Sequence, residues 1–131
     1  MNWAYIAGFF DGEGCLSLHT TRMNISIYQS GAIGEQVLRE IGAWLSTKGI
    51  ESIMYHRNRT DKLSKKELWE VRLNKRASQL KFLSGVLPFI RVKKVLAQDC
   101  VRYYTMFPPN NWWMYGTGRI GEENRVVWRN D

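Results

Sequence analysis

The 131-residue sequence has little of several residue types that define common protein classes. Its two cysteines, Cys15 and Cys100, lie far apart and belong to no CxxC pattern, so neither a disulfide framework nor a structural zinc site is indicated. No apolar run approaches the length of a membrane span, and the N-terminus lacks the basic leader of a signal peptide. We therefore expect an intracellular protein of the cytoplasm, nucleoid or an organelle, with no membrane partner and no secretion.

Several common catalytic signatures are also missing. The two histidines, His19 and His56, do not form an HExxH pair, and the chain contains no Walker sequence, Gly-rich phosphate loop or GxSxG elbow. Zinc proteases, P-loop nucleotide hydrolases and α/β-hydrolases are therefore poorly supported. Acidic residues are scarce too: 12 Asp and Glu stand against 19 Lys and Arg, which gives a formal net charge of +7. This excess favours a polyanionic partner through phosphate neutralisation.

The most informative stretch is residues 4–14, Ala-Tyr-Ile-Ala-Gly-Phe-Phe-Asp-Gly-Glu-Gly. Its apolar residues predict a short buried helix, with Asn2 as the N-cap. Gly12 suits the left-handed turn that would end this helix. Asp11 and Glu13 then lie at a helix C-terminus, where carboxylates are unfavourable unless a cation is present.

Three small residues of this helix, Ala4, Ala7 and Gly8, share one stripe because they are spaced i, i+3 and i+4. A second helix could approach closely along that stripe. Two such oxygen-rich helix ends brought together would make a site for a hard divalent ion such as Mg²⁺. The alternative is a buried helix followed by an ordinary turn into a strand.

Residues 6–14 resemble the signature of the LAGLIDADG homing endonucleases position by position. The departures are conservative: other apolar residues stand at positions 6, 9 and 10, Gly12 replaces the small residue, and Glu13 replaces the second acid. The motif occurs once, and single-motif chains of this family work as homodimers with the two motif helices at the interface. The resemblance therefore implies a homodimer joined along the small-residue stripe.

The residues after this helix alternate with period two over 15–20 and 23–28, which predicts a hairpin of half-buried strands. The inward residues are Leu16, Leu18, Met23, Ile25 and Ile27. The opposite face carries Ser17, His19, Thr21, Arg22, Asn24, Ser26 and Tyr28. These hydrogen-bonding side chains suit contact with base edges in a DNA groove, although a solvated sheet face would have the same polarity.

A second hairpin is predicted over residues 52–58 and 68–73, around a polar, basic loop at 59–66. Glu70 and Arg72 face outward in its second strand. The inward face of the first strand is ambiguous: the two candidate sets are Ile53, Tyr55 and Arg57, or Met54, His56 and Asn58. The residues expected to face nucleic acid here are Arg57, Arg59, Glu70 and Arg72. A solvated hairpin tip is the alternative.

Helical periodicity predicts further helices over about residues 32–48 and 77–86, and a last one that ends near Tyr104. Ser30 is the expected cap of the first of these, and Gly49 its terminator.

This order is not a βαβ alternation, so an α+β class with helices on one face of an antiparallel sheet fits better. It also matches the αββαββα LAGLIDADG fold with its saddle-shaped, four-stranded sheet. We expect an endonuclease domain over residues 1–104. The remainder, 105–131, is an aromatic, proline-containing extension that either packs back on the body or stacks on a partner.

The resemblance also assigns a site. Glu13 matches the family's metal-binding acid, and the carbonyl of Gly12 is the expected backbone ligand beside it. The implied cofactor is Mg²⁺, with Mn²⁺ as a substitute. Asp11 matches the first acid of the motif, and we expect it to accept hydrogen bonds where the helix ends.

Two further residues match catalytic positions of the family. Gln29 follows the second strand, where relatives carry a Gln that orders the attacking water. Lys93 lies in Pro-Phe-Ile-Arg-Val-Lys, which resembles the segment that carries a catalytic lysine. The alternatives are an ordinary polar residue at a strand end and a solvated lysine at a helix start. One departure is Ile33, which stands where some relatives have a basic residue.

The resulting hypothesis is a homodimeric homing endonuclease that cleaves both strands of a long, pseudo-palindromic double-stranded DNA site by metal-dependent phosphodiester hydrolysis. Its implied role is homing of an intron or intein. The alternative is a non-cleaving binder on the same fold, either an intron maturase whose partner is RNA or a transcription regulator. An intact Glu13 favours the nuclease, because non-cleaving members often lose this acid.

Overall fold

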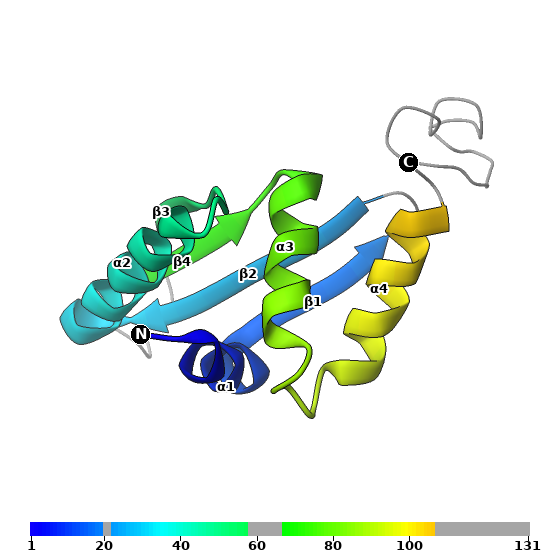
Figure 1. Ribbon diagram of the computed structural model, residues 1–131. Coiled ribbons are helices and arrows are strands. Elements are labelled where there is room, and N and C mark those ends of the chain that lie inside the picture. Colours follow the sequence, from blue (N-terminus) through cyan, green and yellow to red (C-terminus); the bar gives the residue numbers. More distant parts are fainter. Residues whose placement is uncertain (20–21, 58–66, 107–131) are drawn as a thin grey trace. The chain divides into compact units, whose positions relative to one another are not determined.

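The computed structural model describes residues 1–19, 22–57 and 67–106 (Figure 1). The elements are α1 (Trp3–Glu13), β1 (Gly14–His19), β2 (Arg22–Ser30), α2 (Gly31–Thr47), β3 (Ile53–Arg57), β4 (Leu68–Leu73), α3 (Arg76–Val86) and α4 (Lys94–Met106). This order confirms the predicted αββαββα arrangement and the helix that follows it. Thr21, Arg59 and the extension beyond residue 106 lie outside the described residues, so the expectations for them, and the domain boundary, stay predictions.

The four strands form one sheet in the order β1-β2-β4-β3. Strand β4 pairs antiparallel with both β2 and β3, and Val71 lies opposite Ile27 on one side and Met54 on the other. The predicted α+β class with an antiparallel four-stranded sheet is therefore confirmed.

The chain divides into two compact units. The first contains Met1–Cys15 and Asn24–Val92, and the second contains Leu16–Met23 and the described residues from Lys93 onward. Most of the sheet and helices α1, α2 and α3 thus belong to the first unit, while α4 belongs to the second.

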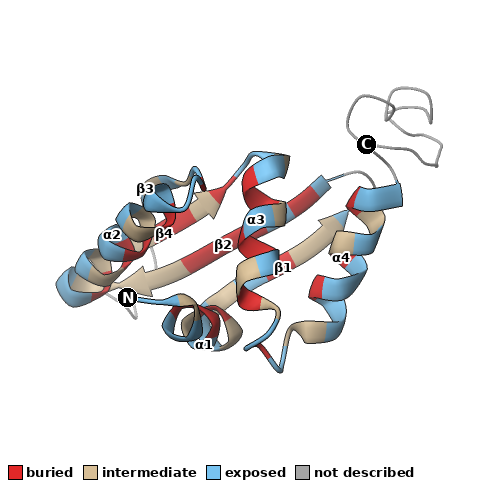
Figure 2. Cartoon of the chain, viewed as in Figure 1, coloured by how far each residue is buried: buried red, intermediate tan, exposed pale blue. Residues whose placement is uncertain are grey.

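In the first unit, helices α1, α2 and α3 cover one face of the strands, and the core lies between them (Figure 1). Buried positions recur along β2 and α3 (Figure 2). The core side chains include Ile6, Phe10, Ile25, Ile27, Leu38, Ile41, Leu45, Val71, Leu73, Phe82, Leu83 and Val86. Burying each contributes about 1.5–3 kcal/mol, so this layer is the main stabilising feature of the unit.

Aromatic side chains join the three helices of this unit. The Phe82 ring of α3 forms T-shaped pairs with Phe10 and Trp3, with ring centroids 5.0 and 6.1 Å apart. Trp3 also meets Trp44 of α2 edge-on at 5.1 Å. Its indole occupies the space that a Cβ on Gly85 would need. Edge-to-face pairs of this kind add about 0.5–1.5 kcal/mol beyond the area they bury, so α1 is fixed firmly on its inner side.

Helix α1 begins as predicted, because Asn2 Oδ1 accepts a hydrogen bond from Tyr5 N at 2.8 Å. It ends later than predicted. The sequence places a left-handed Gly12 at the helix end, but the helix continues through Gly12 to Glu13. Among the described residues, glycines with positive φ occur only at Gly31 (78°) and Gly49 (73°).

Gly14 is the glycine that allows α1 to pass directly into β1. Its N–H donates to the carbonyl of Phe10, and its backbone is extended. A Cβ at this position would collide with the Phe10 ring and lie 2.6 Å from the Phe10 carbonyl oxygen. The close approach of strand and helix, rather than a left-handed turn, therefore requires glycine here.

Helix α2 follows the predicted boundaries closely. Gly49, with its positive φ, follows its C-terminal turn as expected. Ser30 occupies the N-cap position but makes no side-chain hydrogen bond to the first turn. The entry into α2 is held instead by Gly31 N, which donates to the carbonyl of Glu67 at 3.0 Å.

The second unit is built on α4, which buries Ala97, Cys100 and Tyr104. The Tyr104 hydroxyl accepts a hydrogen bond from Met23 N at 3.1 Å, a link across 81 residues of sequence. Burial, with the nearby Asp99 charge, raises the pKa of Cys100 to about 11, so this thiol stays neutral at ordinary pH. Among the described residues, no helix is both long and apolar enough to cross a membrane.

Candidate functional site

The sheet face that α1, α2 and α3 leave open carries a group of polar side chains from β2, β3 and β4. Strand pairing places Tyr28 and Tyr55 on either side of Glu70. Directly paired residues point to the same side of a sheet, so these three side chains form a row. The next row along β4 places Ser26 beside Arg72. The outward set predicted for β2 and β4 is therefore on one face.

The same pairing decides the ambiguous strand β3. Met54 pairs with the buried Val71, and His56 pairs with Trp69, so both point toward the helices. The His56 ring stacks on Trp69 at 4.2 Å, and the guanidinium of Arg39 from α2 lies 5.5 Å from the same indole. Ile53, Tyr55 and Arg57 consequently lie on the open face, as the expectation for Arg57 requires.

Glu70 is the centre of a charge cluster on this face. Arg72 donates from Nε and Nη2 to its two carboxylate oxygens, at 2.8 and 3.1 Å. Arg57 reaches Glu70 Oε1 from β3 at 3.1 Å. The side chain of Glu70 is 1% exposed, against 32% for Arg72 and 53% for Arg57. The expectation of an accessible, outward Glu70 is thus corrected: the carboxylate lies on the open face but underneath two arginines.

Arg72 also packs against Tyr55, whose ring centroid lies 4.7 Å from the guanidinium carbon. The hydrogen bond to Glu70 raises the pKa of Arg72 above its ordinary value, and this outweighs the lowering caused by burial. Arg72 is therefore charged at every accessible pH. Ser26, beside it, is also buried, so its accessibility was overestimated from the alternating pattern.

The other residues predicted for this face differ in exposure. His19, Arg22 and Asn24 are exposed, while Ser17 and Tyr28 are half-buried.

The two carboxylates at the end of α1, Asp11 and Glu13, have different surroundings. Asp11 Oδ2 accepts hydrogen bonds from Arg91 N at 2.8 Å and Val92 N at 3.0 Å, as expected for a structural acid. Glu13 is exposed, and an added Cβ on Gly12 would meet nothing within 4 Å. Within the described part of the chain, no three His, Cys, Asp or Glu side chains gather into a metal-binding group.

The outer face of α1 is a stripe of small residues. Ala4, Gly8 and Gly12, spaced four apart, are all exposed, and the space beside Gly8 is open. Ala7, by contrast, is fully buried within its own chain. Ala7 therefore has no surface that a partner helix could contact. The predicted interface stripe of Ala4, Ala7 and Gly8 is corrected to Ala4, Gly8 and Gly12.

Gln29 and Lys93 are less exposed than Glu13. Strand β2 runs through Gln29, which pairs with Trp69 and so points to the helix side, half-buried against the start of α2. A Cβ on Gly34 would come within 2.8 Å of the Gln29 Cβ. Lys93 is half-buried just before α4, and its carbonyl accepts from Ala97 N at 2.9 Å. Ile33, which stands where the resemblance implies a basic residue in some relatives, is 79% exposed.

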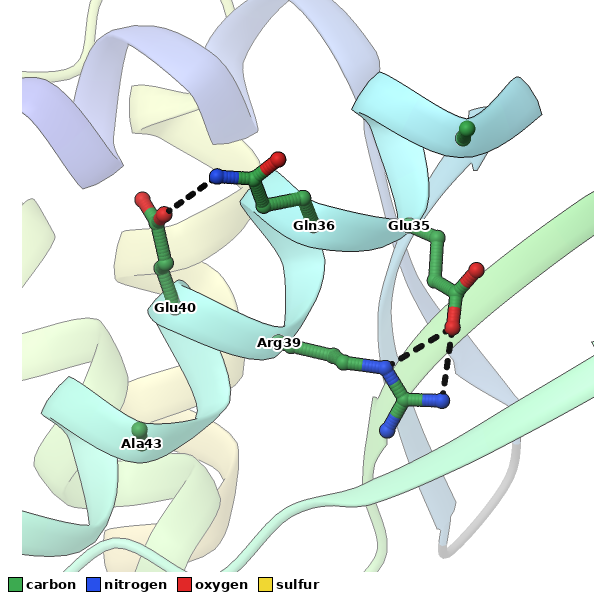
Figure 3. Close-up of a pocket in the computed structure, with 6 residues that line it drawn as sticks. Glu35, Gln36, Arg39, Glu40 and Ala43 are labelled. Atoms are coloured by element: carbon green, nitrogen blue, oxygen red, sulfur yellow. Dashed lines mark hydrogen bonds and ion pairs between the residues drawn. The ribbon is translucent and has the colours of Figure 1, made fainter.

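A shallow hollow of about 360 Å³ on α2 is a competing location (Figure 3). It is lined by Ala32, Glu35, Gln36, Arg39, Glu40 and Ala43. Its polar groups bond one another, through the Arg39–Glu35 pair at 2.7 Å and the Gln36–Glu40 hydrogen bond at 3.3 Å (Figure 3). Because all the lining residues come from one helix and the four polar side chains are paired with one another, the hollow does not present converging polar groups to a ligand.

The comparison with solved structures defines the class of fold. The chain is similar to a crystal structure of the homing endonuclease I-CvuI in complex with its target (Sro1.3) in the presence of 2 mM Ca, with a TM-score of 0.62 and 20% identity over 83% of this chain and 69% of that chain. A second I-CvuI structure, with the I-CreI target (C1221), 2 mM Mg and uncleaved DNA, gives 0.60 and 20% over 82% and 68%. The chain thus has the LAGLIDADG homing endonuclease fold.

The family follows from sequence. The model of the LAGLIDADG-like domain matches residues 2–86, well over half of the chain. The chain therefore belongs to the LAGLIDADG-like family, as the single motif at 6–14 predicts. A comparison with curated protein sequences gives no match.

Proposed function

We propose that this chain is a site-specific DNA endonuclease that acts as a homodimer on a long, pseudo-palindromic duplex. The observation that carries the proposal is the construction of α1: an exposed carboxylate, Glu13, ends a helix whose outer face is a stripe of small residues. Two copies packed along Ala4, Gly8 and Gly12 would bring their Glu13 side chains together. Each subunit would then serve one DNA strand.

The open sheet face supports DNA as the substrate. It carries Arg57 and Arg72 around one buried carboxylate, so the cluster keeps an excess of positive charge. The chain as a whole has a net charge of +7, and a dimer would double it. Cationic and hydrogen-bonding side chains on an extended strand surface suit phosphates and base edges in a major groove.

The residues at the end of α1 fit a divalent cation as half of a site. Glu13 and the Gly12 carbonyl are the hard oxygen ligands that Mg²⁺ prefers, and the second copy would supply the rest. When bound, Mg²⁺ or Mn²⁺ would polarise the phosphate and lower the pKa of the attacking water. Asp11 is excluded from this set, because its carboxylate already holds two backbone amides.

Gln29 and Lys93 complete the proposal as assisting residues. The amide of Gln29 both donates and accepts, so it can orient a water. The ammonium of Lys93 can stabilise charge that develops on the phosphate. The intact, exposed Glu13 favours this nuclease over a non-cleaving RNA maturase or transcription regulator on the same fold. The biological role proposed with it is homing of an intron or intein.

Cleavage of a pool of randomised duplexes, compared in Mg²⁺ and in Ca²⁺, tests the proposal. We expect cleavage with Mg²⁺ that Glu13→Gln reduces by roughly 100-fold or more, because the neutral amide is a much poorer ligand for a hard cation. Duplex binding in Ca²⁺ should persist, since the sheet face is unchanged.

The matched control is Glu40→Gln, which removes an exposed carboxylate on α2 that hydrogen-bonds only within its own helix. It should leave cleavage at the wild-type rate. Full cleavage by Glu13→Gln would disprove the metal assignment. Duplex binding by the wild type without any cutting would favour the non-cleaving alternative.

A further inference from the structure

The charge cluster on the open sheet face has an unusual arrangement for a binding surface. Its only carboxylate, Glu70, is buried at the bottom, and two arginines from neighbouring strands converge on it. A buried carboxylate without partners would be strongly unfavourable, so the ion pairs with both arginines stabilise the burial of Glu70. The cluster as a whole presents only cationic groups outward.

The two arginines are held very differently. Arg72 is bound side-on through Nε and Nη2 and covered on one face by Tyr55. Arg57 is paired with Glu70 Oε1 through Nη2 at 3.1 Å, and its side chain is 53% exposed. Arg72 therefore has one fixed orientation, whereas the more exposed Arg57 is held by an ion pair.

This difference determines which atoms each arginine can offer. Side-on binding uses the Nε and one Nη2 hydrogen of Arg72 and leaves the end of its guanidinium, with parallel N–H groups on Nη1 and Nη2, pointing away from Glu70. Such a fork matches the O6 and N7 acceptors of guanine in the major groove. A more exposed cation such as Arg57 suits a phosphate, which needs charge rather than a fixed direction.

We propose that Glu70 is a positioning residue for DNA specificity: it aligns Arg72 on a guanine and leaves Arg57 to a nearby phosphate. This inference rests on the proposed function and deepens it. Glu70 itself makes no contact with DNA. It acts by restricting one arginine to the orientation in which both of its end-on N–H groups meet the same base edge, so the ordering cost is met before binding.

Selection of bound sequences from a randomised duplex pool, in Ca²⁺ so that no DNA is cut, tests this inference. The wild type should enrich a guanine at one position in each half-site, by about 10- to 100-fold over other bases. Arg72→Lys, which keeps the charge but has no fork, should lose the preference at that position. Glu70→Gln should relax the same position and no other.

Arg57→Ala gives the complementary result. It should keep the guanine preference while lowering the slope of log affinity against log salt by about 0.9, the value for one phosphate contact. The matched control is Glu51→Gln, an exposed acid paired with Lys75 away from this cluster, which should change neither quantity.

The outcomes separate the inference from the function beneath it. If the wild type enriches no sequence, the proposed function fails. If it enriches a site but Glu70→Gln keeps the guanine preference, or no guanine is selected, the positioning role is overturned. Thermal unfolding is measured for each variant. If Glu70→Gln does not fold, Glu70→Asp replaces it: the shorter carboxylate should weaken the guanine preference, and an unchanged preference would overturn the inference.

Discussion

At the scale of single residues, similar carboxylates do different work because of what surrounds them. Glu70 is buried beneath two guanidiniums, Asp11 holds two backbone amides, and Glu13 is exposed. Of these three carboxylates, Glu13 is the one whose binding to a cation would break none of the contacts just named. The accessible acid is therefore the one that we propose as a metal ligand.

Asp11 gives a direct test of a structural acid. Asp11→Ala removes the acceptor of Arg91 N and Val92 N, which join the end of α1 to the segment after α3. We expect the free energy of unfolding to fall by about 1–2 kcal/mol, since hydrogen bonds to charged acceptors are among the stronger ones. Urea denaturation measures the change.

Asp99→Ala is the control for this variant. Asp99 makes an exposed pair with Arg102 one turn away, at 2.8 Å. Surface pairs of this type contribute little, so a change within about 0.5 kcal/mol is expected. Equal effects of the two substitutions would contradict the structural role of Asp11.

At the scale of elements, α1 has two faces with opposite properties. Its inner face is locked by Trp3, Phe10 and the Phe82 ring of α3. Its outer face is small and open at Gly8 and Gly12. Because the outer face of α1 is also apolar and has small side chains, it suits close packing against a second copy of the helix, which is the assembly we propose.

Gly8→Leu separates folding from assembly. The space around Gly8 is open, and Leu favours a helix over Gly by about 1 kcal/mol, so each subunit should fold at least as well as the wild type. The bulky side chain should, however, keep two helices apart. Sedimentation equilibrium should therefore find monomers, with an unchanged helical circular dichroism spectrum.

Ala43→Leu serves as the matched substitution on an exposed position of α2 and should leave the association unchanged. A Gly8→Leu protein that still dimerises with wild-type affinity would mean that the copies join through another surface.

At the scale of the whole molecule, residues far apart in sequence stabilise each compact unit. Tyr104 near the end of α4 accepts the Met23 N–H of the first hairpin. Tyr104→Phe keeps the ring and removes this acceptor, so a buried amide loses a hydrogen bond. The free energy of unfolding should fall by about 1–2 kcal/mol, which thermal or urea denaturation measures.

Tyr5→Phe removes a hydroxyl from a residue that is 48% exposed and provides the comparison. Its stability should stay near that of the wild type. If Tyr104→Phe behaved in the same way, the bond to Met23 would not contribute to stability.

Much of the fold could be predicted because it is encoded locally. Period-two and helical periodicities gave the order of elements, and residues 6–14 gave the family that the domain model confirms. The helix end was misplaced at Gly12, because nothing local reveals that Gly14 lies against the Phe10 ring. The Glu70 cluster could be predicted only in part. The spacing of Glu70 and Arg72 places them on one face of β4, but Arg57 belongs to β3, and the sequence does not show that it pairs with Glu70.

The sequence by itself determined the class of fold, the excess of positive charge and the acidic end of the first helix, since these depend on residue type and short-range spacing. Only the tertiary structure decided which side chains remain accessible. Pairing with β4 sets which side chains of β3 face the helices. Packing within the chain buries Ala7, and two arginines cover Glu70. Accessibility is set by neighbours that the chain brings from distant positions, and no local pattern contains them.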